Sequence, residues 1–146
     1  MAIWQLCFNA VEKNKNLDDK DICLWTKEPN DVYNISFLCK AKSWSSEIIQ
    51  FGNIDETCIE LISEQNKVVE ISVRLDLRTL DKKQLYSLIG YIDKIDANIF
   101  YQGNLYTPSI TSFTEMIQNS SALKFCRDPF LFLENISVSL SNNTGK

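Results

Sequence analysis

A stretch of ten residues near the middle of the chain constrains its fold more than any other feature. From Val69 to Arg78, apolar and polar residues alternate at every position. Because successive side chains of a strand point to opposite faces, this alternation predicts a long β-strand with one face against a core. The predicted inner row is Val69, Ile71, Val73, Leu75 and Leu77, and the predicted outer row is Glu70, Ser72, Arg74, Asp76 and Arg78.

The sequence on either side of this strand predicts a meander followed by a helix. Strands are expected over residues 47–51 and 57–63, and a polar turn at 65–67 joins them to the long strand. Downstream, Asp81 and Gln84 have the spacing of a capping box, with Leu80 and Leu85 placed for a hydrophobic staple. An apolar stripe of helical period then follows, formed by Leu85, Leu88, Ile89, Ile92 and Ile95.

The remaining segments complete a single α+β domain. Further strands are expected over residues 3–11, 97–101 and 105–107. A second helix begins at Ser109 or Thr111 and directs Ile110, Phe113 and Ile117 inward, and a third begins near residue 120. Residues 31–40 fit either a strand or a short capped helix, and the helix is favoured. We therefore expect one domain over residues 1–136, with a mainly antiparallel sheet and about three helices packed on it, and a polar tail over 137–146.

Composition predicts a folded cytoplasmic protein. Of the 146 residues, 45% are hydrophobic, which is enough for a core, and no apolar run approaches the roughly 20 residues that span a bilayer. The N-terminus has neither a basic lead nor a small-residue cleavage site. The five cysteines are scattered and never form a Cys-x-x-Cys pair, so we expect buried, reduced thiols that bind no metal.

The residue types disfavour an enzyme. The chain has no histidine, which removes Ser-His and Cys-His nucleophile pairs and histidine-ligated metal sites. Its four glycines are dispersed and form no phosphate-binding loop. Carboxylates could still meet across the meander, but Arg74 and Arg78 flank Asp76 at same-face spacing, which favours surface ion pairs over acid–base work. We therefore predict no catalytic residue, no metal site and no cofactor.

The charge distribution disfavours a nucleic-acid partner. Residues 1–73 carry 12 acidic and 7 basic residues for a net charge of −5, whereas residues 74–146 carry 7 acidic and 8 basic residues for +1. A nucleic-acid-binding protein normally shows a basic surplus or stripe, and none is present. The acidic N-terminal half could instead attract a basic protein partner, although an ordinary solvated surface is the favoured interpretation of the same excess.

Several short segments resemble a group of small bacterial proteins. These segments are Ser43-Trp44, Phe51-Gly52, Val73-Arg74-Leu75-Asp76-Leu77-Arg78, Ser121-Ala122-Leu123-Lys124-Phe125 and Asp128-Pro129. Over residues 43–133 the chain also resembles, more loosely, the single-domain immunity proteins encoded beside contact-dependent or secretion-delivered toxins. The resemblance implies a cytoplasmic antidote that binds one toxin domain and blocks its active site or its partner surface.

Our leading hypothesis is thus a non-enzymatic, immunity-type binding protein without a membrane or nucleic-acid partner. Trp, Tyr and Arg side chains and the charged outer row are its predicted anchors. The predicted interface residues are Trp44, Glu47, Asp55, Glu70, Arg74, Asp76, Arg78, Tyr101 and Tyr106. Two alternatives remain: a carboxylate-based enzyme or ligand-binding protein with a concave acidic pocket, and a structural adaptor that forms a stable oligomer.

Overall fold

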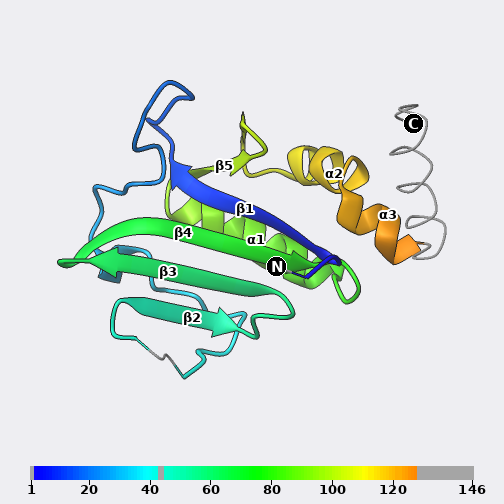
Figure 1. The fold of residues 1–146 in the computed structure, drawn as a ribbon, viewed down its shortest axis with the longest axis horizontal. Coiled ribbons are helices and arrows are strands. Elements are labelled where there is room, and N and C mark those ends of the chain that lie inside the picture. The colour runs from blue at the N-terminus through cyan, green and yellow to red at the C-terminus, as the bar shows by residue number, and fades with distance from the viewer. Residues whose placement is uncertain (1, 43–44, 128–146) are drawn as a thin grey trace, which may run out of the picture.

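The computed structural model of the chain describes residues 2–42 and 45–127. These residues form six strands, three α-helices and one short 3-10 helix (Figure 1). The elements are β1 (Gln5–Glu12), η1 (Pro29–Asp31), β2 (Ile48–Gly52), β3 (Cys58–Glu64), β4 (Lys67–Asp76), α1 (Lys82–Lys94), β5 (Ala97–Tyr101), β6 (Asn104–Tyr106), α2 (Ile110–Gln118) and α3 (Ser121–Arg127). Within the described ranges, no helix is both long enough and apolar enough to cross a membrane.

All six strands belong to one antiparallel sheet with the order β2-β3-β4-β1-β5-β6. The predicted meander is present as β2, β3 and β4. The first strand of the chain lies between β4 and β5, so the N-terminal segment occupies the middle of the sheet. The predicted α+β fold with an antiparallel sheet and three helices is confirmed.

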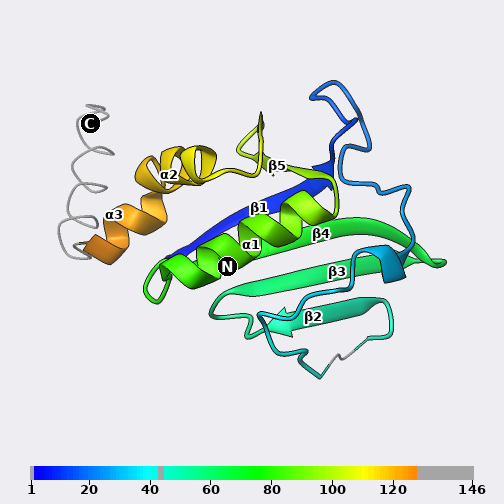
Figure 2. The ribbon, with the colours of Figure 1, turned by 180° about the vertical axis from the view of Figure 1, so that it is seen from behind.

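One face of the sheet, here called the inner face, is apolar and covered. A row of paired residues crosses all six strands on this face, formed by Ile49, Leu61, Ile71, Ala10, Ile99 and Tyr106. Helix α1 lies over this face (Figure 2), and the buried side chains of Trp25, Val32 and Ile35 extend the same core. Burying a large apolar side chain contributes roughly 1.5–3 kcal/mol, so this layer supplies most of the driving force for folding.

A β-bulge corrects the predicted inner row. Ser63 pairs with Val68 and Ile62 pairs with Glu70, which leaves Val69 as the extra residue on β4. Val68 therefore takes the buried position predicted for Val69, which is partly exposed. Beyond the bulge the predicted alternation holds, because Ile71, Val73 and Leu75 are all fully buried. Leu77 follows the end of β4 and packs only partly against the core.

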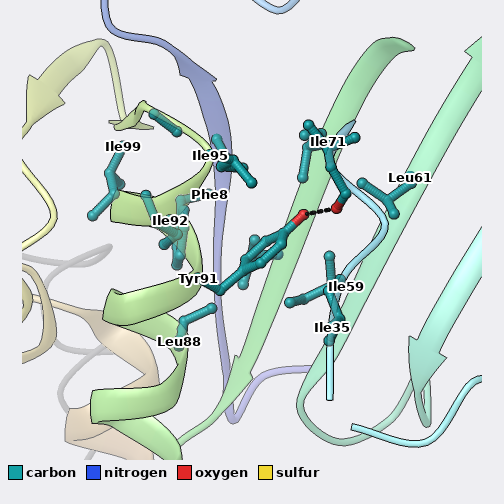
Figure 3. Close-up of a cluster of buried hydrophobic side chains, with 14 of the residues drawn as sticks. Phe8, Ile35, Ile59, Leu61, Ile71, Leu88, Tyr91, Ile92, Ile95 and Ile99 are labelled. Atoms are coloured by element: carbon teal, nitrogen blue, oxygen red, sulfur yellow. Dashed lines mark hydrogen bonds between the residues drawn. The ribbon is translucent and has the colours of Figure 1, made fainter. Parts of the chain in front are cut away.

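Helix α1 begins as predicted, with the Asp81 carboxylate accepting a hydrogen bond of 2.8 Å from the Gln84 backbone amide. Its buried face includes Tyr91, which was not part of the predicted stripe. The Tyr91 hydroxyl donates a 2.7 Å hydrogen bond to the Val32 carbonyl, and burial raises the pKa of this hydroxyl. Figure 3 shows the Tyr91 ring pointing from α1 toward the neighbouring strands, with its hydroxyl in this bond. A hydrogen-bonded hydroxyl is the condition under which a tyrosine ring can be buried without penalty.

Two other predictions of local structure are wrong. Residues 31–40 do not form the favoured helix. The 3-10 turn η1 ends at Asp31, and the chain then runs along the edge of β2. There Ala41 donates to the Gln50 carbonyl and Gly52 donates to the Cys39 carbonyl. In α2, Ser109 is the cap and Phe113 is buried as predicted. Ile110, however, is exposed and Met116 is buried instead. The predicted domain end at residue 136 and the tail after it lie outside the described residues.

Candidate interaction surface

The face of the sheet opposite α1, here called the outer face, carries polar side chains and has no described helix over it (Figure 1). Its central row also crosses all six strands and consists of Gln50, Glu60, Ser72, Asn9, Phe100 and Leu105. Every residue of this row is partly exposed. An antiparallel sheet can hold one face on the core and the other toward water, and the contrast between the two rows fits that arrangement.

An ion pair lies near the middle of the outer face. Arg74 Nη2 lies 3.4 Å from Glu60 Oε1, and the two side chains are only 24% and 13% exposed. Arg74 is therefore neutralised by its own chain and is not a free anchor for a partner. Its strand neighbours on either side are cysteines, Cys58 on β3 and Cys7 on β1.

The thiols beside Arg74 are not activated. Burial raises the pKa of Cys58 to about 12, and burial likewise raises the pKa of Cys7. Because the thiolate is the reactive form, both side chains stay protonated and inert near neutral pH. All five cysteines are free thiols, but the prediction that they are buried holds only for Cys58, because Cys39 is exposed and the other three are partly exposed.

A second arginine, Arg78, binds residues of its own chain at one end of the sheet. Arg78 donates to both carboxylate oxygens of Asp76, with Nε–Oδ1 at 3.0 Å and Nη2–Oδ2 at 2.9 Å. Its guanidinium carbon lies 3.9 Å from the centroid of the Trp4 ring, a cation–π contact. The Asp55 carbonyl accepts hydrogen bonds from Trp4 Nε1 and from Arg78 Nη2. These four residues, here called the Arg78 clasp, connect the start of β1, the β2–β3 turn and the end of β4.

The clasp overturns the prediction that Asp76 is a surface residue. The side chain of Asp76 is fully buried, because Arg78 folds back over it. Burial alone would raise the pKa of this carboxyl, but the hydrogen bonds and the charge of Arg78 outweigh burial and hold the pKa below its usual value. An ionised carboxylate with its oxygens occupied is neither a proton donor for catalysis nor a contact for a partner.

The other predicted interface residues are spread over the molecule. Glu70 is partly exposed and lies six residues before the clasp on β4, roughly 20 Å away along the strand. Glu47 is exposed just before β2, and Asp55 is exposed in the β2–β3 turn. Tyr101 and Tyr106 lie on the inner-face side, where both are partly buried against the core. Trp44 lies outside the described residues.

The sequence interpretation missed the uncharged members of the outer face. Asn9, Phe100 and Leu105 come from three separate segments and meet only through strand pairing. The only signal available in the sequence was the alternation within each strand, which assigns a residue to a face but does not name its neighbours.

The structure also contains an open groove of about 620 Å³ between residues 37–41, the end of β2 and the start of α1. Only one carboxylate, that of Glu56, lines it. Among the described residues, no three cysteine, aspartate or glutamate side chains gather so as to hold a metal ion. Every buried side-chain nitrogen or oxygen in the described part also has a hydrogen-bond partner, so no orphaned polar atom there points to a ligand.

Comparison with protein-family models, with curated proteins and with solved structures found no match to this chain. The geometry and charge of the surfaces described above are therefore the basis on which a function can be proposed.

Proposed function

We propose that the chain is a non-enzymatic, immunity-type binding protein that neutralises a bacterial toxin by covering the toxin's active site or partner surface. The observation that carries the proposal is the outer face, a broad surface of mixed polar and apolar side chains with no described helix over it, on a sheet whose opposite face is packed against the core. A rigid, preformed surface loses little conformational entropy on binding, which favours tight association.

The dimensions of the outer face suit such a role. Six strands spaced about 4.8 Å apart span about 24 Å, and a strand the length of β1 extends roughly 26 Å. The product is on the order of 600 Å², close to the roughly 800 Å² that each partner buries in an interface of standard size. The face is therefore large enough to hold one protein domain.

The charges around this face favour a basic partner. Both arginines of the predicted outer row are neutralised by carboxylates of their own chain. Glu47, Asp55 and Glu70 have no ion-pair partner among the described residues, so three carboxylates without an ion pair lie on this face or at its ends. Such a field steers a basic domain toward the face and speeds association, most strongly at low salt.

No specific observation favours a carboxylate-based enzyme. That alternative requires several acids in one pocket and a carboxyl group with a raised pKa. The groove contributes Glu56 alone, and the buried carboxyl group of Asp76 has a lowered pKa. The two acids that are buried among the described residues, Glu12 and Asp76, lie at opposite ends of the sheet, and each is hydrogen-bonded within its own chain.

Co-expression with the products of adjacent genes tests the proposal. We expect the wild-type chain to restore growth to cells that produce the toxin encoded next to it and to co-purify with that toxin. The Glu70→Lys variant should bind about tenfold or more weakly, because it reverses a charge on the outer face. Glu115→Lys makes the same charge change on the exposed side of α2 and should bind like the wild type.

Circular dichroism of both variants verifies that each is folded. Recovery of the wild-type chain only as a free monomer, with no protection against any neighbouring gene product, would contradict the proposal. Equal loss of binding in the two variants would instead show that net charge, and not the outer face, governs association.

A further inference from the structure

The two outermost strands of the sheet differ in how their free sides are covered. At one border, residues 39–41 lie against β2 and are joined to it by two backbone hydrogen bonds of 2.8 Å, with exposed Lys40 in the middle of this covering segment. At the other border, β6 pairs with β5 alone among the described strands. No described segment lies beyond β6 in either ribbon view (Figures 1 and 2). We call this free side of β6 the β6 edge.

The turn before β6 decides which of its backbone groups face outward. Gln102 and Gly103 have φ of +47° and +77°, as in a two-residue type I′ turn. The residues that flank such a turn, here Tyr101 and Asn104, form a hydrogen-bonded pair. The next residue of β6, Leu105, therefore occupies a non-hydrogen-bonded position opposite β5. Its N–H and C=O groups point away from β5, toward the β6 edge.

The β6 edge lacks the features that usually keep sheet edges apart. Natural edge strands are blunted by charged side chains, especially Lys, by bulges, or by a covering segment. Residues 97–114, which include all of β5 and β6, contain no Asp, Glu, Lys or Arg and form the longest uncharged stretch of the chain. Pro108 follows the strand and removes no donor from it. Apolar side chains are accessible instead, because Leu105 is partly exposed and Ile110, at the start of α2, is 39% exposed.

A second copy of the chain matches the charge and the direction of this edge. The chain has a net charge of −4, so two copies repel each other over most of their surfaces, whereas the uncharged border allows close approach. A twofold axis perpendicular to the sheet sets β6 antiparallel to β6 of the second copy. The Leu105 residues of the two copies then face each other and exchange both N–H···O bonds.

We propose that two copies of this chain associate through their β6 edges, with Leu105 at the twofold axis, and form one continuous antiparallel sheet. The two outer faces become one surface, which stays open to a further partner, and the Leu105 side chains meet on it. A strand of three residues buries less than the roughly 800 Å² that each partner buries in an interface of standard size. The dimer therefore dissociates on dilution.

Sedimentation velocity of the purified chain over a wide range of concentrations tests this proposal. The wild type should pass from monomer to dimer as its concentration rises. Leu105→Pro should weaken the dimer about tenfold or more, because it removes the donors of both hydrogen bonds at the axis and leaves the bonds between β5 and β6 in place. Leu105→Ala removes the same side chain but keeps these donors, so it should dimerise more strongly than Leu105→Pro.

A charge variant tests the same position without a change in the backbone. Leu105→Lys places two like charges opposite each other at the axis and should weaken the dimer, most strongly at low salt. Leu17→Lys makes the same change at a position that is 53% exposed in the loop after β1, and it should dimerise like the wild type. Circular dichroism verifies that each variant is folded.

Three results would overturn the proposal: a wild-type chain that stays monomeric at every concentration, wild-type dimerisation of a folded Leu105→Pro or Leu105→Lys variant, or an equal loss in Leu17→Lys. The experiment contains no toxin. A failure here and a failure of the toxin proposal are therefore distinguishable.

Discussion

Alanine substitution at three glycines separates three physical effects that the structure assigns to them. Gly52 ends β2 with φ +85°, and a Cβ atom there would lie 2.2 Å from the Thr57 carbonyl oxygen. Gly103 has φ +77° in the β5–β6 turn, with no atom within 4 Å of the same position. Gly90 has neither a left-handed backbone nor a close neighbour.

The expected changes in the free energy of unfolding follow from these differences. A left-handed backbone costs an L-residue roughly 1–2 kcal/mol, so Gly103→Ala should lose about that much. Gly52→Ala adds a clash against backbone, worth about 1–3 kcal/mol more, for a total of about 2–5 kcal/mol. Gly90→Ala should gain about 0.8–1 kcal/mol, which raises the melting temperature by about 2–4 °C in a domain of this size.

Urea unfolding followed by circular dichroism measures all three variants against the wild type, with the slope m checking that each still unfolds in one step. The order of stability should be Gly90→Ala, wild type, Gly103→Ala and Gly52→Ala. Equal losses in the variants of Gly52 and Gly103 would refute the close approach of the Thr57 carbonyl. A loss in Gly90→Ala would refute the open position of that glycine.

Three further predictions concern buried groups. Asp76 has a lowered pKa in the folded state, so its stabilising contribution is present above the usual pKa of 3.8 and is lost as pH falls through the folded-state pKa. Asp76→Asn should therefore be less stable than the wild type at pH 7. Urea titrations should show that the difference in the free energy of unfolding between the two proteins disappears in acid. Tyr91→Phe leaves a buried carbonyl unpaired and should cost about 1–3 kcal/mol by urea unfolding, whereas Tyr86→Phe at an exposed position should cost almost nothing. In thiol labelling at pH 8, exposed Cys39 should react first and Cys58 last; rapid modification of Cys58 in the folded protein would contradict its burial.

Sequence patterns correctly predicted the structural features that are set by residues close together in the chain. The alternation in β4 identifies its inner residues, and the Asp81–Gln84 spacing places the start of α1, because strand faces and helix caps are set within a few residues. The bulge at Val69 was missed because it depends on the register with β3, which is formed by residues elsewhere in the chain. The central position of β1 in the sheet also depends on distant parts of the chain, because β1 pairs with β4 and β5.

The candidate surface was harder to predict than the fold. Alternation correctly places Arg74 on the outer face but gives no sign that Glu60 neutralises it. It also treats Asp76 as exposed, whereas the fold of Arg78 over it and the contact with Trp4 bury the carboxylate.

Hydroxyl-radical footprinting of the chain, free and bound to a toxin that co-purifies with it, tests most directly whether the outer face is the proposed docking surface. We expect binding to lower the oxidation of Ile62, Phe100 and Leu105, which lie on the outer face, and to leave exposed Tyr86 on α1 unchanged. Unchanged oxidation of the three outer-face residues, with protection of Tyr86, would contradict it.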